Sequence, residues 1–174
     1  DKVPESWLQE FLNQDIEYII VASNHTKQAI ENTLIDSYKS IVIYKSIVMP
    51  KIITIPHGVD LNLFYPKDKP ERLTFLVNKG WRSNEDRGGT QYAVRAYLEE
   101  FDSKDEVSMI IKINPAYGIP DVNKLVDELK PIDKTDFAPL HMTADNIPYD
   151  KLVNLYNQAN VFLAPTRAES FGIP

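Results

Sequence analysis

From Arg72 onward the chain alternates between short apolar runs and helix-like segments, and this alternation limits the possible folds more than any other feature. The apolar runs are rich in β-branched residues, as buried strands are, and apolar residues recur at helical spacing between them. The pattern predicts an α/β fold: a doubly wound parallel sheet, covered by helices and joined by right-handed crossovers. The predicted strands are 73–77, 107–113, 137–142 and 161–164, and the predicted helices are 90–101, 122–130 and 149–159.

The residues before this alternation predict a second, smaller set of elements. Ser23 and Asn24 are of the residue types that begin helices, because their side chains accept hydrogen bonds from the first free backbone amides. Residues 57–70 are rich in turn formers and contain two prolines, which indicates a linker between two units. The predicted elements before the linker are helices over 1–14 and 26–34 and strands over 16–22, 41–48 and 51–56.

Composition excludes several classes of protein. The 174 residues carry a net charge of −6, which argues against a nucleic-acid-binding protein. There is no cysteine, so neither a disulfide framework nor a thiolate metal site is expected. No apolar run approaches the ~18 residues of a membrane helix, and no basic amphipathic face supports membrane docking. Without a secretory pattern at its start, the chain is expected to be cytoplasmic.

The stretch Val161–Pro174, VFLAPTRAESFGIP, combines features of an anion site. Its first part is a short buried strand that ends at Pro165, and its second part reads as the start of a helix, with Ser170 as a possible cap. A strand, a sharp turn and a helix N-terminus place backbone amides and the positive end of a helix dipole together. In α/β domains, ligands bind beyond the carboxyl ends of strands in such places.

This stretch also carries a family resemblance. It is similar to the P-S-R-x-E-x-F-G-x-P signature of retaining GT-B glycosyltransferases of family 4, also called glycosyl transferases group 1. In that family the glutamate opens a pair of glutamates with seven residues between them, and the second would fall three positions past Pro174. The matching residues are Pro165, Arg167, Glu169, Phe171, Gly172 and Pro174.

Three further stretches resemble the same family in the same order along the chain. Residues 52–66, IITIPHGVDLNLFYP, resemble the segment that leaves the N-terminal domain, and residues 75–89 resemble the first strand and phosphate loop of the donor domain. Residues 147–159 resemble the helix before the signature strand. The resemblance implies two Rossmann-like domains, of which this chain is a fragment that is inactive alone. Residues 1–56 would be the end of the acceptor-side domain, 57–70 the linker, and 71–174 the front of the nucleotide-sugar-binding domain.

The loop after strand 73–77 holds the candidate residues for the donor diphosphate. Negative charge grows on that diphosphate as the glycosidic bond breaks, and cations and backbone amides aimed at it stabilise the transition state. The family has two basic residues here; Lys79 or Arg82 could be the first, and Arg87, followed by Gly88, fits the second. Arginine suits the role because its planar fork matches pairs of phosphate oxygens. Asn78 stands where the family commonly has glycine.

The resemblance assigns the remaining site residues. Glu169 takes the catalytic position, as an acceptor for sugar hydroxyls and not as a nucleophile. No metal is implied and no cofactor is expected, since the nucleotide-sugar is a substrate and no histidines and carboxylates have ligand spacing. The donor-sugar residues would be Glu169, Ser170, Phe171 and Gly172, the nucleobase region Asn146 and Ile147, and the cleft side of the linker His57 and Gly58.

The implied function is transfer of a sugar, with retention of configuration, from a UDP-, GDP- or ADP-sugar to an acceptor. The acceptor is an unknown glycan, lipid or small molecule. Two alternatives stay open from the residues alone. The chain could be a non-catalytic nucleotide- or phosphate-binding α/β module, which would keep the basic loop without sugar chemistry. It could also belong to another GT-B enzyme class.

Overall fold

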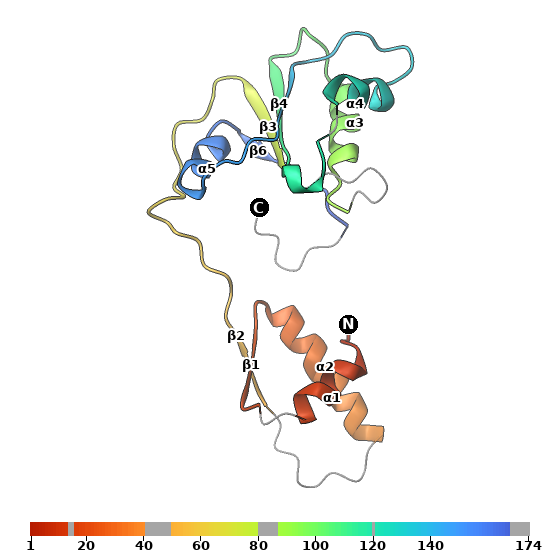
Figure 1. Ribbon diagram of the computed structural model, residues 1–174, viewed down its shortest axis with the longest axis vertical. Coiled ribbons are helices and arrows are strands. Elements are labelled where there is room, and N and C mark those ends of the chain that lie inside the picture. The colour runs from red at the N-terminus through yellow and green to blue at the C-terminus, as the bar shows by residue number, and fades with distance from the viewer. Residues whose placement is uncertain (14–15, 41–49, 80–86, 120, 168–174) are drawn as a thin grey trace. The chain divides into compact units, whose positions relative to one another are not determined.

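The computed structural model describes residues 1–13, 16–40, 50–79, 87–119 and 121–167. The chain divides into two compact units, unit 1 (Asp1–Val59) and unit 2 (Asp60–Pro174), and each is described by itself (Figure 1). The division falls within the segment predicted as a linker. Across the described ranges, no helix has the length and apolar character needed to cross a membrane.

Among its described residues, unit 1 pairs two strands with two helices. The strands are parallel, with Tyr18 opposite Lys51. Ser23 caps the second helix as predicted, because its Oγ accepts a hydrogen bond from the backbone amide of Thr26 at 3.1 Å. That helix is longer than predicted, and the strand predicted over 41–48 lies outside the described residues. The elements are α1 (Glu5–Asn13), β1 (Tyr18–Val21), α2 (Asn24–Ser40) and β2 (Lys51–Thr54).

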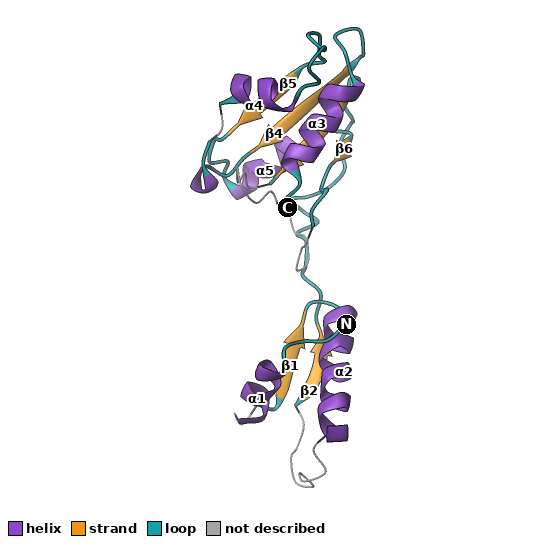
Figure 2. Ribbon diagram, turned by 90° about the vertical axis from the view of Figure 1, so that its right-hand side faces the viewer, coloured by secondary structure: helices purple, strands orange, loops and turns teal. Residues whose placement is uncertain are grey.

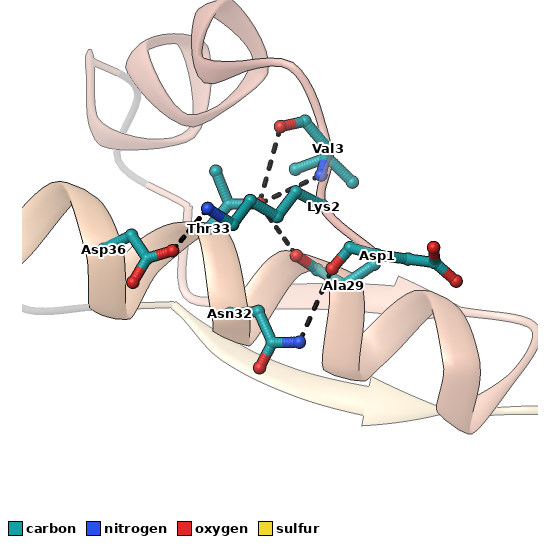
Figure 3. A network of polar contacts seen from close by, with 7 residues as sticks. All are labelled: Asp1, Lys2, Val3, Ala29, Asn32, Thr33 and Asp36. Carbon is teal, nitrogen blue, oxygen red and sulfur yellow. Dashed lines mark hydrogen bonds and ion pairs between the residues drawn. The ribbon is translucent and has the colours of Figure 1, made fainter.

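A small apolar cluster and a polar network hold unit 1 together. The buried residues of the cluster are Leu8, Val21 and Ile30. The N-terminal segment runs along α2, where the backbone amide of Val3 donates to the Thr33 hydroxyl at 2.9 Å (Figure 3). That hydroxyl donates in turn to the carbonyl of Ala29 at 2.8 Å. Burial of a polar group destabilises the fold unless the group is hydrogen-bonded, so this network attaches the segment to α2.

Unit 2 is built on a parallel sheet of four described strands in the order β5-β4-β3-β6. The first strand of unit 2 along the chain, β3, is therefore an inner strand, and the chain later returns to its other side to form β6. This order is that of a doubly wound, Rossmann-like sheet. The elements are β3 (Leu73–Asn78), α3 (Thr90–Glu100), β4 (Val107–Lys112), a 3-10 turn at Pro115–Tyr117, α4 (Val122–Leu129), β5 (Leu140–Thr143), α5 (Tyr149–Tyr156) and β6 (Val161–Phe162).

Helices cover both faces of this sheet. Figure 1 shows α3 and α4 on one side of β3 and β4, and α5 on the other side; Figure 2 shows the same unit turned by 90°. The α3–α4 side holds the main apolar cluster, in which Val94 and Leu98 of α3 pack with Met109 and Ile111 of β4. Leu76 and Val77 of β3 are fully buried. Burial on both faces explains the continuous apolar runs of these strands.

The strand predicted over 137–142 is shifted, because β5 begins at Leu140. Ladder pairing with β4 starts at Met109 opposite Leu140. Ala138 is buried in the apolar cluster and Phe137 packs against it, which explains why the prediction began early. Pro139 has no amide to donate, although its carbonyl accepts from the amide of Met109 at 3.0 Å. Apolar burial therefore begins before the strand does.

The end of the predicted linker packs within unit 2. Phe64 makes edge-to-face contacts with two tyrosines of α5, at ring-centroid distances of 5.5 Å to Tyr149 and 6.2 Å to Tyr156. Aromatic pairs at such distances contribute stabilisation beyond the area that they bury. The segment after Asp60 is therefore attached to α5 by its aromatic side chain.

Candidate functional site

The candidate site lies where the strand order of unit 2 reverses. From β3 the chain passes through α3 to β4 on one side, whereas β6 pairs with the other edge of β3. Because all the strands are parallel, the segments that follow β3 and β6 leave the same edge of the sheet. In open α/β sheets, ligands bind outside the carboxyl ends of the strands at such a switch point. The loop predicted to bind phosphate and the signature stretch are the segments that leave this point.

The structure brings these two segments into direct contact. A Cβ on Gly89 would lie 2.0 Å from the carbonyl oxygen of Pro165, so no larger residue fits there without a backbone shift. Arg87 lies two residues before Gly89, and Arg167 lies two residues after Pro165. The backbone amide of Arg167 donates to the carbonyl of Arg87 at 2.9 Å. The turn after β6 is thus attached to the loop that leads into α3. The sequence predicted each segment separately, and their contact is a property of the fold.

Helix α3 begins at this contact with its first amides lacking a side-chain cap. Its N-cap is Gly89, with φ 74° and ψ 13°, which is a left-handed conformation that favours glycine. Thr90, the first helical residue, is fully buried, and its hydroxyl has no hydrogen-bond partner among the described residues. The N-terminus of a helix carries a partial positive charge and donor groups that point outward. It is therefore suited to an anion.

Two exposed arginines flank this helix start. Arg87 precedes Gly89 in the same loop, and Arg167 follows β6. In the described part of the chain, neither guanidinium has a carboxylate within ion-pair distance. Arg167 instead lies over the ring of Tyr92, at 5.5 Å from its centroid, and its Nη2 donates to the Tyr92 hydroxyl. Among the described residues, two arginine side chains thus place positive charge beside this helix start.

Lys79, the other described candidate for the diphosphate, lies where β3 ends. It is half-buried, and its backbone amide donates to the carbonyl of Lys112 at 3.3 Å. Lys112 is the last residue of β4; its side chain is buried and its ammonium donates to the carbonyl of Ile113. Burial lowers the pKa of Lys112, and the nearby carboxylate of Asp145 opposes that shift. Lys112 is on β4 and thus lies one strand away from the switch point.

Asn78, at the end of β3, has a structural partner. Its side-chain amide donates to the hydroxyl of Tyr156 at 2.7 Å. Burial raises the pKa of Tyr156, and the hydrogen bond from Asn78 opposes this effect. The bond joins the carboxyl end of β3 to α5, on the side of the sheet away from α3. The hydrogen bond therefore links β3 to α5 at the edge of the candidate site.

The other sequence-predicted residues fall into three groups. Asn146 is exposed and Ile147 half-buried in the loop after β5, at the same edge of the sheet but two strands from β3. His57 and Gly58 are exposed in unit 1, which is described by itself. Across the described ranges no cluster of three or more His, Asp or Glu residues could hold a metal ion. Arg82, Glu169, Ser170, Phe171 and Gly172 lie outside the described residues.

Sequence reasoning did not select Arg167 and Tyr92 as site residues. Arg167 is within the signature, but the partner that orients it is 75 residues away in the sequence. Tyr92 reads as an ordinary position in an amphipathic helix. An arginine shortly after the predicted strand 161–164, in an acidic chain, was the available signal for Arg167. The hydrogen bond and ring contact in the folded chain identify Tyr92 as its partner.

Comparison with known proteins shows the fold. No protein-family profile and no curated protein matches the chain. Its structure is similar to the crystal structure of the GtfA/B complex, with a TM-score of 0.61 and 20% sequence identity over 98% of this chain. The chain spans 30% of the length of the chain that it matches there. The α/β fold predicted from the sequence, of GT-B type with a Rossmann-like parallel sheet, is therefore confirmed.

Proposed function

We propose that unit 2 is the donor-binding part of a glycosyltransferase that takes a sugar from a nucleotide-sugar. The observation that carries this proposal is the helix start at the switch point, where α3 has no side-chain cap and Arg87 and Arg167 have no carboxylate partner among the described residues. The fold supports the proposal, since GT-B enzymes place a nucleotide-sugar beside such a sheet edge. The resemblance of the closing signature adds the sugar.

The chemistry of the proposed reaction requires positive charge at this place. When the bond between sugar and diphosphate breaks, the diphosphate takes the electron pair and its negative charge increases. Arg87, the amides of the first turn of α3 and the helix dipole would stabilise that charge more in the transition state than in the bound substrate. Gly88 leaves its backbone open to a phosphate, because it carries no side chain.

The sugar side of the site rests on the resemblance. Glu169 is proposed to accept hydrogen bonds from sugar hydroxyls, with Ser170, Phe171 and Gly172 beside it. Retention of configuration and membership of family 4 are proposed on the same ground. Asn146 and Ile147 are proposed to border the nucleobase, where backbone groups make most of the contacts. We propose that the reaction uses neither a metal nor a cofactor.

The first test is calorimetric titration of the chain with UDP, GDP and ADP, and with their glucose and mannose conjugates. The proposal expects saturable binding of one nucleotide and tighter binding of one of its sugar conjugates. Arg87→Ala should weaken the diphosphate about tenfold or more, since charge-assisted hydrogen bonds to phosphate are lost. Arg95→Ala is the matched control, because Arg95 is exposed on α3 and pairs with Glu99 at 2.9 Å instead. Absence of binding by the unaltered chain would contradict the proposal.

A second variant separates a glycosyltransferase from a phosphate-binding module. Glu169→Gln removes the carboxylate but keeps the size of the side chain. If Glu169 receives sugar hydroxyls, this change weakens the nucleotide-sugar and leaves the free nucleotide unaffected. Equal affinities for the nucleotide-sugar before and after the change would favour the non-catalytic module.

A further inference from the structure

We propose that Arg167 is a second diphosphate-binding arginine of this site and that Tyr92 is the positioning residue that orients it. The inference rests on the proposed function, because it assigns two further residues to the same donor site. It starts from the contact between Arg167, which follows β6, and Tyr92 of α3. The signature and the basic loop do not include Tyr92. One cation from the turn after β6 is attached to the first turn of α3, where the proposed diphosphate lies.

Arg167 is held at both its backbone and its side chain. Its backbone amide donates to the carbonyl of Arg87 at 2.9 Å, so the backbone segments that carry the two arginines are adjacent. Its guanidinium lies 5.5 Å from the centre of the Tyr92 ring and donates to the hydroxyl of that tyrosine through Nη2. Tyr92 is the third residue of α3. The guanidinium is therefore beside the first turn of that helix.

The orientation leaves donors available for a ligand. A guanidinium has five N–H groups in a fixed fork, and the hydrogen bond to Tyr92 uses one of them. Arg167 remains exposed, and no carboxylate in the described ranges neutralises it. A doubly charged phosphate group accepts parallel hydrogen bonds from such a fork. The hydroxyl of Thr90 at the helix start is buried and has no hydrogen-bond partner among the described residues.

Pre-orientation gives Tyr92 its effect on binding. A free arginine loses on binding most of the rotamer freedom of a long side chain, which lowers affinity. The hydrogen bond and ring contact with Tyr92 restrict that freedom before the ligand arrives. Tyr92 has 53% of its surface exposed, so its role in the core of unit 2 is small. Its substitution should therefore act on Arg167 and leave the fold intact.

The experiment compares nucleoside diphosphates with the monophosphates of the same base. UDP and UMP, GDP and GMP, and ADP and AMP are titrated against the unaltered chain, Arg167→Ala, Arg167→Lys and the control Arg95→Ala. We expect Arg167→Ala to weaken the diphosphate about tenfold while weakening its monophosphate threefold or less. Arg167→Lys should recover part of the loss, because it restores the charge without the fork. Inorganic pyrophosphate serves as a probe that lacks any base.

A double-mutant cycle tests the role of Tyr92. Tyr92→Phe keeps the ring and removes the hydroxyl, and Tyr92→Leu removes both contacts. We expect losses in diphosphate affinity of about twofold and about fivefold, in that order. In the Arg167→Ala background, Tyr92→Leu should cause no further loss, because its effect acts through Arg167. Additive losses would show that Tyr92 affects the site by another route and would overturn its assignment.

Other outcomes separate this inference from the proposed function. If the unaltered chain binds a nucleotide and Arg87→Ala weakens it, while Arg167→Ala does not, the donor site stands and the role of Arg167 is wrong. If Arg167→Ala weakens the binding of diphosphate and monophosphate by the same factor, Arg167 stabilises the turn after β6 and does not bind the diphosphate. If the unaltered chain binds neither nucleotides nor pyrophosphate, both proposals fail.

Discussion

Gly89 is the residue at which the two segments of the candidate site depend most closely on one another. Its φ of 74° is unfavourable for other residues, and an added Cβ would meet the carbonyl carbon and oxygen of Pro165 at 2.7 and 2.0 Å. We expect Gly89→Ala to lower the free energy of unfolding of unit 2 by at least about 3 kcal/mol, as backbone strain and overpacking add. Urea unfolding followed by circular dichroism measures this loss, and nucleotide binding should be lost with it.

Gly118 provides the matched control for that substitution. Its φ is also positive, at 96°, but no described atom lies within 4 Å of an added Cβ. Gly118→Ala therefore carries backbone strain without the clash, and should cost about 1–2 kcal/mol while nucleotide binding persists. Equal losses at Gly89 and Gly118 would mean that the contact with Pro165 is unimportant.

Tyr97 makes the stability of unit 2 sensitive to alkaline pH. Burial raises the pKa of Tyr97 to about 12, and its hydroxyl donates to the carbonyl of Pro139 at 2.9 Å. Between pH 10 and 12 the unfolded chain releases this proton while the folded chain keeps it. The stabilising contribution is thus complete below pH 10 and is lost as the pH rises, by about 2–3 kcal/mol in total.

The comparison with Tyr97→Phe isolates this contribution from the other titrating groups. At pH 8 the variant should be less stable by about 1 kcal/mol, since one hydrogen bond is removed. As the pH rises from 10 to 12 the difference should shrink and then reverse, because phenylalanine does not titrate. Urea unfolding at pH 8, 10 and 11 tests this, and a constant difference across the series would show that the burial of Tyr97 does not affect its titration.

At the scale of elements, Asn160 attaches the short strand β6 to β3. Its side-chain oxygen accepts from the amide of Thr74 at 2.8 Å, and its side-chain nitrogen donates to the carbonyl of Pro70 at 3.2 Å. Its own amide donates to the carbonyl of Thr74 at 2.9 Å. Asn160→Ala leaves the amide of Thr74 unpaired, so we expect a loss of about 1–3 kcal/mol in unfolding free energy.

Two further variants test the Asn160 prediction. Asn160→Asp keeps the acceptor for Thr74 and loses the donor, so it should cost less than the alanine variant. Asn154, exposed on α5, is the control, and Asn154→Ala should change stability by less than about 0.5 kcal/mol. A loss at Asn160 no larger than that at Asn154 would show that β6 is held by its backbone pairing alone.

Elements with strong apolar periodicity were predictable from the sequence. The bounds of α3 and β4 agree with the predicted 90–101 and 107–113 to within one residue, because burial alone determines their pattern. β6 ends at Phe162 although the apolar run continues to Ala164. Pro165 ends the apolar run, whereas the end of the strand depends on pairing with the neighbouring strand β3. The attachment of Arg167 to Tyr92 could not be predicted, because it depends on which strands are adjacent.

At the scale of the whole molecule, the described residues form two separate apolar clusters. The cluster of unit 1 has three buried residues, Leu8, Val21 and Ile30, whereas the cluster of unit 2 is built from β4, α3 and their neighbours. A domain with few buried apolar residues is marginally stable, because its burial hardly exceeds the loss of chain entropy. Unit 1 should therefore unfold at a lower temperature than unit 2.

Ligand linkage assigns the donor site to one of these units. A ligand that binds only folded unit 2 stabilises it by about 2.7 kcal/mol at a concentration one hundred times Kd. For a unit of this size the upper calorimetric transition should rise by roughly 10 °C, while the lower transition stays in place. The nucleotide that binds in titration is the ligand, and Arg87→Ala should abolish the shift at the same concentration. Movement of both transitions together would show that the two units unfold as one, and movement of the lower transition alone would place the ligand in unit 1.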